Sequence, residues 1–306
     1  MNFNKLIKST YPYILAIILL YFVWKIFSGN NISQVFNHIT LELIAVSFIF
    51  YTLLIKPINT LRYSYFFKIE KINQLYWIMN FSNLMVNFLP FRSGELTYIH
   101  YLKKLGIERS KSISGLLTIR FFDYVVLALL FAISLISMGT IFISHEEIIV
   151  WSIISLPLIV LLGLFLVYKL AKKNGKINRI MLAGLTEIRS YKLNKLSSLL
   201  GLSLLYWSIR LLFGYVLLLM LGINLNFLTV VFISTLLILV GLIPIQVFSN
   251  FGVFEFGWVY LLSNLSINID KNILFNKILA FHLAPLIPVI IMGILGYIFL
   301  RIFNSK

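Results

Sequence analysis

ILAFHLAPLIPVIIMGILGYIFL, residues 278–300, contains no Asp, Glu, Lys or Arg. A transmembrane helix needs roughly 20 predominantly apolar residues to cross about 30 Å of hydrocarbon, and this stretch is long enough. The pattern recurs along the chain, so the sequence predicts an all-α fold, a polytopic transmembrane helical bundle. The further apolar stretches lie at 11–27, 41–57, 74–91, 116–143, 150–168, 197–221, 227–246 and 250–264.

Composition supports the same fold class. The 306 residues are 60% hydrophobic and 12% charged, with a mean hydropathy of +0.96, which no water-soluble globular protein of this size shows. We therefore expect a single integral membrane domain over 1–306 with about six to eight spans. The net charge of +16 resides in short loops, which favours anionic lipid headgroups as partners and argues against nucleic acid. The chain has no cysteine and no zinc-binding histidine pair, so we expect neither a metal nor a cofactor.

Basic loops stay on the cytoplasmic side of a membrane, and this rule predicts the orientation. Segments 56–73, 92–115 and 169–196 are rich in Lys and Arg, and the last of them is expected to be the main basic cytoplasmic loop. Segments 28–40, 144–149 and 222–226 carry no Lys or Arg and are expected outside. Both termini are then cytoplasmic.

Two apolar segments do not fit single crossings. Segment 74–91 has cytoplasmic loops on both sides, so it must be re-entrant or lie flat in the interface. Segment 244–264 must also return, either as a re-entrant hairpin or as part of two full crossings. Each is followed or interrupted by Pro, Gly and Glu, which predicts two structural repeats of opposite topology with a transport site between them. The alternative is that Pro and Gly only kink ordinary spans. The residues are Pro90, Gly94 and Glu95 in the first segment, and Pro244, Gly252 and Glu255 in the second.

Charged residues inside or beside the apolar runs are the candidate site, because each costs at least about 2.5–3.5 kcal/mol on insertion scales. Arg120 and Asp123 are three residues apart and are expected to pair, with Glu95 nearby. Arg210 lies in the middle of a span and is expected to meet Glu255 or a lipid phosphate. A purely structural role for these ion pairs is the competing interpretation.

Two other residue types have plainer interpretations. His282, near Pro285 and Pro288, is expected to be a packing donor more often than a proton relay. The aromatic residues, Trp207 among them, are typical of belts at the two membrane interfaces.

Four short motifs resemble a known family. They are Pro90-x-Arg92-x-Gly94-Glu95, Gly106 in a basic loop, Arg120-x-x-Asp123, and Gly252-Val-Phe-Glu255. Their order is similar to the flippase-like family, also called the lysylphosphatidylglycerol synthase transmembrane region. The chain departs from that family at Ile119, where an acid is usual, and at Ser249 and Asn250, where paired glycines are usual.

The resemblance implies a protein of the bacterial or archaeal cytoplasmic (inner) membrane that moves polar-headed lipids between leaflets. Arg92 enters the candidate translocation site with Glu95, Arg120, Asp123, Arg210 and Glu255, while Pro90, Gly94, Pro244 and Gly252 shape the hairpins. The sequence has no nucleotide-binding loop, so an ATPase is not expected. The alternatives are a non-transporting scaffold that docks a cell-envelope enzyme through 169–196 and, less favoured, a membrane lipid transferase. We expect no enzyme activity.

Overall fold

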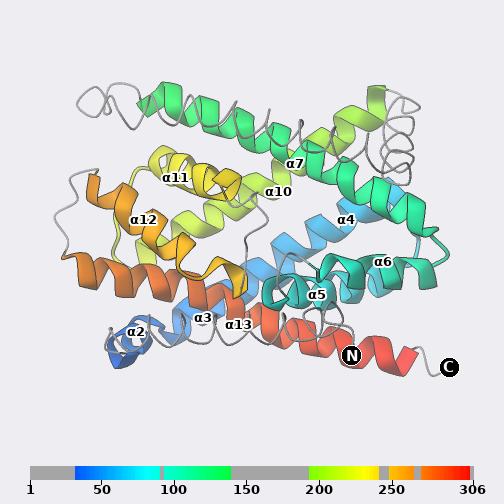
Figure 1. Cartoon of the computed structure of the whole chain (residues 1–306), viewed down its shortest axis with the longest axis horizontal. Coiled ribbons are helices and arrows are strands. Elements are labelled where there is room, and N and C mark those ends of the chain that lie inside the picture. The colour runs from blue at the N-terminus through cyan, green and yellow to red at the C-terminus, as the bar shows by residue number, and fades with distance from the viewer. Residues whose placement is uncertain (1–31, 90–92, 139–192, 241–247, 265–269, 304–306) are drawn as a thin grey trace, which may run out of the picture.

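A computed structural model describes residues 32–89, 93–138, 193–240, 248–264 and 270–303. All regular structure in these ranges is helical (Figure 1). The elements are α2 (Ile32–His38), α3 (Leu41–Ile49), the π-helical turn η1 (Phe50–Ile55), α4 (Lys56–Phe67), α5 (Ile72–Phe88), α6 (Glu95–Lys104), α7 (Arg109–Met138), α10 (Leu193–Met220), α11 (Phe227–Val240), the 3-10 turn η4 (Phe248–Asn250), α12 (Val253–Asn264) and α13 (Lys271–Phe303).

The expected helical membrane bundle is confirmed. Four helices are long and apolar enough to cross a membrane: Leu41–Phe67, Arg109–Ser137, Asn194–Met220 and Lys271–Ile302. The spans predicted at 11–27 and 150–168, and most of the basic loop 169–196, fall outside the described residues, although α10 already begins at Leu193.

The predicted cytoplasmic loop 56–73 is wrong over most of its length, because α3, η1 and α4 form one continuous helix from Leu41 to Phe67. Pro57 lies within this helix although proline removes a helical hydrogen bond. The helix continues because η1 widens the preceding turn: the N–H of Lys56 donates to the carbonyl of Tyr51, five residues back, and Pro57 then lies in the first turn of α4. Arg62, assigned to a loop by the sequence, is 1% exposed.

The first interrupted segment is one helix followed by a reversal. α5 is unbroken over Ile72–Phe88, so the chain does not turn within 74–91 as a compact hairpin would; the return begins at α6. Gly94 makes this reversal fit. A Cβ at this position would lie 2.2 Å from the backbone of Met85 and Val86, so only glycine allows α6 to start against α5.

In the second interrupted segment, 244–264, the described elements are η4 and α12, and α12 packs on the long helix α13, whereas the preceding α11 packs on α7. The tip of this segment meets the end of α5: Ser249 Oγ donates a hydrogen bond of 3.0 Å to Asn87 Oδ1. In Figure 1, α11 and α12 lie on the left and α5 and α6 on the right, with α13 running past both. The two apolar segments that Pro and Gly interrupt in the sequence are therefore in contact with each other.

Two hydrophobic clusters form the interior. One is formed by α2, α3, η1, α10, α11, α12, α13 and the second half of α7. The other is formed by α4, α5, α6 and the first half of α7, together with Leu199 of α10 and Leu300 of α13. On α7 the clusters meet between Phe122 and Val126, which places Asp123 at their boundary. We call the polar residues near this boundary the polar layer; they are Arg62, Glu95, Arg120, Asp123, Tyr206, Trp207 and Arg210.

Candidate functional site

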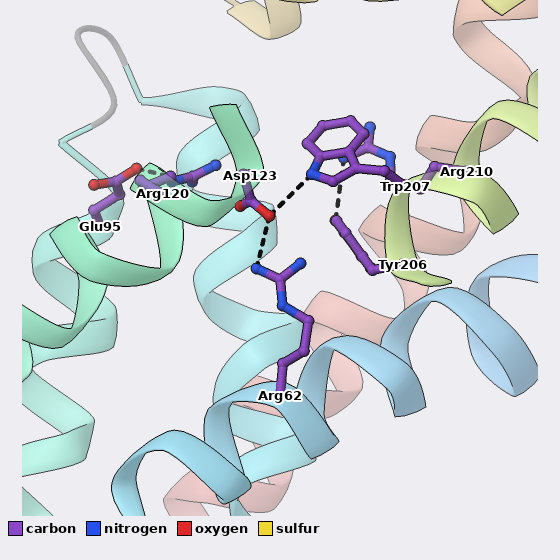
Figure 2. A network of polar contacts seen from close by, with 7 residues as sticks. All are labelled: Arg62, Glu95, Arg120, Asp123, Tyr206, Trp207 and Arg210. Carbon is purple, nitrogen blue, oxygen red and sulfur yellow. Dashed lines mark hydrogen bonds and ion pairs between the residues drawn. The ribbon is translucent and has the colours of Figure 1, made fainter. Parts of the chain in front are cut away.

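A fully buried ion pair is the centre of the polar layer (Figure 2). Arg62 Nη2 on α4 lies 2.8 Å from Asp123 Oδ1 on α7, and their side chains are 2% and 5% exposed. The indole N–H of Trp207 on α10 donates to the same oxygen at 2.9 Å. Three helices therefore converge on one carboxylate.

Aromatic rings extend this centre toward Arg210. The Arg62 guanidinium lies 4.7 Å from the ring centroid of Tyr206, and the Arg210 guanidinium lies 4.9 Å from that of Trp207. Arg210 Nη1 also donates to the Tyr206 hydroxyl at 3.1 Å. The Arg210 side chain is exposed, and among the described residues no carboxylate pairs with it. Arg210 is therefore held in place by rings and retains unused donors.

Glu95 and Arg120 form a second, half-buried pair. Arg120 Nη2 on α7 donates to Glu95 Oε1, at the start of α6, over 3.1 Å. The predicted pairing of Arg120 with Asp123 is therefore wrong. Each residue instead pairs with a neighbouring helix: Glu95 at the first hairpin reaches Arg120, and Arg62 of α4 reaches Asp123.

The predicted pairing of Arg210 with Glu255 is also wrong. Glu255 lies in the first turn of α12, which packs on α13, and its Oε1 is 2.5 Å from Nδ1 of His282. Its other oxygen, Oε2, accepts the backbone N–H of Gly252 at 2.7 Å, as in a helix capping box. Arg210 lies on α10 and stacks on its own helix's aromatic residues instead.

The structure divides the predicted site residues between two places. Glu95, Arg120, Asp123 and Arg210 belong to the polar layer, whereas Glu255 lies at the tip of the second interrupted segment. Gly94 and Gly252 lie at the two tips, and Gly252 needs its freedom because its φ is +89°. Arg92, Pro90 and Pro244 fall outside the described residues.

Sequence reasoning missed Lys56, Arg62 and Tyr206, and it assigned Trp207 to an interfacial belt. Trp207 is 4% exposed and lies mid-helix, so the belt assignment is wrong for it. The sequence does contain a pattern that could have predicted helix α4. The buried residues of α4 recur at helical spacing from Lys56 to Thr60, Tyr63 and Phe67, and no glycine occurs between 30 and 93.

The polar layer carries an excess of positive charge. The three guanidinium groups of Arg62, Arg120 and Arg210 face two carboxylates, and the 4%-exposed Lys56 lies within electrostatic reach of two of the arginines. Lys56 Nζ is 5.2 Å from the Tyr51 ring centroid. Two buried arginine nitrogens, Arg62 Nη1 and Arg120 Nε, have no hydrogen-bond acceptor among the described residues. Buried N–H donors are nearly always satisfied, so this layer is chemically suited to an anion.

A family model described as the lysylphosphatidylglycerol synthase TM region matches residues 11–293. The chain belongs to this family. No curated protein and no solved structure matches it. Membership relates the chain to the metabolism or transport of membrane lipids, and together with the four long apolar helices it makes the chain a multi-pass membrane protein.

Two of the motifs that carry the resemblance lie in different places in the structure. Arg120-x-x-Asp123 supplies a residue to each of the two ion pairs of the polar layer, while Gly252-Val-Phe-Glu255 starts α12 and faces α13. Ser249 supplies the hydroxyl that contacts Asn87, a contact that a glycine at this position would not provide.

Proposed function

We propose that this protein is a flippase-like transporter that moves a polar-headed phospholipid or lipid-linked glycan between leaflets. The observation that carries the proposal is the excess of guanidinium groups over carboxylates in the polar layer, whose central pair, Arg62 and Asp123, lies where the two apolar clusters meet. A charge left without a partner inside a membrane protein is costly, and a phosphate group would neutralise it.

Arg210 is the residue that we propose contacts the headgroup first. It is exposed at mid-helix, it is oriented by Tyr206 and Trp207, and it uses one of its five N–H donors in a hydrogen bond within the described residues. A guanidinium binds phosphate through two parallel hydrogen bonds, which a lysine cannot reproduce.

The buried donors of Arg62 and Arg120 would then receive the phosphate deeper in the layer. Asp123 keeps Arg62 oriented, and Glu95 does the same for Arg120 at the half-buried side. The acyl chains would remain in lipid while the headgroup passes along the arginines. We propose movement and no bond-making step, since each carboxylate of the layer is paired with an arginine within the described residues.

We further propose in which membrane the protein lies and on which side its termini are. Basic loops favour a cytoplasmic location for both termini, and family membership favours the cytoplasmic membrane of a bacterium or archaeon. The contact between Asn87 and Ser249 supports the idea that the two interrupted segments work together as re-entrant elements.

Arg210→Ala is expected to slow lipid transfer between leaflets about tenfold to a hundredfold, because it removes charge-assisted hydrogen bonds worth about 1.5–3 kcal/mol. Purified protein would be reconstituted in liposomes with headgroup-labelled phospholipid, and the fraction protected from an external quencher followed over time. The exposed Arg301 at the end of α13 provides the control, since Arg301→Ala removes an exposed arginine outside the polar layer.

Arg210→Lys should transfer lipid as slowly as Arg210→Ala if bidentate hydrogen bonding to the phosphate is required. It should transfer lipid at the wild-type rate if a positive charge is sufficient. Rates that equal those of empty vesicles for wild type, with the phospholipid and again with a lipid-linked sugar, would overturn the transport proposal. That result would favour the scaffold, whose test is charge reversal in 169–196.

A further inference from the structure

A second polar cluster lies where the two interrupted segments meet, away from the arginines. Asn87 at the end of α5, Ser249 of η4, Glu255 of α12 and His282 of α13 form a continuous chain of hydrogen bonds. Phe251 and Phe254 enclose the imidazole, each with its ring centroid 4.6 Å away. Glu255 is 1% exposed, whereas Asn87 and Ser249 are only partly buried.

Hydrogen-bond directions along this chain fix where the protons are. Asn87 Nδ2 donates to the carbonyl of Asn83 at 2.7 Å, which leaves Asn87 Oδ1 to accept the hydroxyl of Ser249 at 3.0 Å. A hydroxyl has one proton, so Ser249 Oγ must accept from Nε2–H of His282, 3.3 Å away. His282 is therefore protonated on Nε2.

The remaining contact then requires one more proton. His282 Nδ1 is 2.5 Å from Glu255 Oε1, and two lone pairs cannot meet at that distance. The proton is on Nδ1, giving an imidazolium and a carboxylate, or on Oε1, giving a neutral imidazole and a carboxylic acid. Either way the pair holds one proton beyond a neutral imidazole beside a carboxylate, and its net charge is zero.

We propose that Glu255 and His282 form a proton-binding site that joins the two interrupted segments when occupied, with the proton as the coupling ion of transport. The site itself stands on the local geometry; only its coupling to lipid movement rests on the proposed function.

Loss of the proton breaks the contact between the segments. His282 then keeps its single proton on Nδ1, where it donates to the Glu255 carboxylate. Its Nε2 becomes an acceptor, and the Ser249 hydroxyl turns toward it and away from Asn87. One proton leaves, the hydrogen bond between Ser249 and His282 reverses direction, and the hydrogen bond between Ser249 and Asn87 is lost. Ser249 favours such a switch, because its φ of 51° is a conformation that non-glycine residues rarely adopt.

Other charged groups do not account for this proton. α5 and α11, which pack nearby, contain no charged residue. On α13 the closest charge in sequence is Lys277, whose Nζ lies beside Gly222. The other elements packed on α13 are α2, α3, η1 and α10. Their ionisable groups include His38 of α2, the exposed Glu42 of α3, Tyr51 of η1, and Lys195 and Arg210 of α10, which contact Phe66 and Trp207 respectively. Among the described residues, Glu255 and His282 are thus each other's only ionisable contact.

A series of polar contacts leads from this site toward the polar layer. Asn83, whose carbonyl holds Asn87, donates its own Nδ2 to the Tyr51 hydroxyl at 3.2 Å. The Tyr51 ring is the one that Lys56 contacts, and Tyr51 lies within electrostatic reach of Arg210. A change at Asn87 can therefore reach the proposed anion site through one face of α5.

The chain has no native cysteine, so spin labels can be placed at Leu89 and Val253, which flank the joined tips and are 40% and 62% exposed. The distance between the labels would be measured by electron paramagnetic resonance in reconstituted protein at a series of pH values. We expect a shift from a joined to a separated population as the pH rises.

Glu255→Gln is expected to stay joined at every pH, because the amide donates to Nδ1 as a carboxylic acid would. Ser249→Ala should stay separated at every pH, since it removes the link and leaves the proton site. A distance that does not depend on pH in wild type, or a shift that survives in Glu255→Gln, would overturn the inference whether or not lipid moves. If the tips do respond, lipid transfer that is insensitive to a proton gradient would overturn the coupling alone, and absence of transfer would instead reject the proposed function.

Discussion

Asp123→Asn is expected to lower the free energy of unfolding by about 3–5 kcal/mol, the cost of leaving a buried charge without its partner. Arg62 is 1% exposed, and Asp123 is the only carboxylate that pairs with it among the described residues. Asparagine keeps the shape of the side chain and can still accept the Trp207 N–H. The drop in unfolding free energy therefore reports the loss of the Asp123 charge alone. Unfolding of the purified protein in detergent, by heat or denaturant, measures it.

Glu95→Gln is the matched control for this prediction. It removes the same charge from a pair whose side chains are 31% and 32% exposed, where ion pairs contribute about 0.2–1 kcal/mol. A second variant, Arg62→Met combined with Asp123→Asn, should recover part of the stability because no unpaired charge remains. Equal losses for Asp123→Asn and Glu95→Gln would mean that burial does not determine the strength of these pairs.

The fold could be predicted where a single property decides it. Apolar runs starting near 41, 116, 197 and 278 all became helices of spanning length, because crossing hydrocarbon requires length and apolarity alone. The prediction failed at α4, where Lys56, Pro57 and Arg62 look like loop residues. Their helix is stabilised by contacts that no local pattern reveals: a π-helical turn before Pro57 and a carboxylate on α7 for Arg62.

The candidate site was predictable in its members but not in their pairing. The free-energy cost of placing a charged side chain inside a membrane is enough to identify the residues that need partners. They are Glu95, Arg120, Asp123, Arg210 and Glu255. Which partner each finds depends on how helices distant in sequence pack, and spacing within one helix suggested the wrong answer for Arg120 and Asp123. The Pro, Gly and Glu residues that interrupt the two apolar segments predicted the site better, since the residues around Gly94 and Gly252 lie close to the contact between the two segments.

Gly94→Ala is expected to cost about 3 kcal/mol or more of unfolding free energy, at or above the upper end for overpacking. The added methyl group would lie 2.2 Å from the carbonyl carbon of Met85 and from the nitrogen of Val86. Backbone atoms cannot change rotamer to make room, so α6 must move away from α5. Glu95, the next residue, would move with α6 and withdraw from Arg120, so lipid transfer should fall together with stability.

Gly201→Ala on α10 separates this clash from the general effect of replacing a helical glycine. Nothing lies within 4 Å of a Cβ at Gly201, so alanine there should leave stability unchanged or raise it by about 0.5–1 kcal/mol. Both variants would be compared with wild type in the same detergent unfolding measurement. If Gly94→Ala behaved like Gly201→Ala, α6 would not begin against the α5 backbone. The position of Glu95 beside Arg120 would then need another cause, because the close approach at Gly94 is what directs α6 back toward α7.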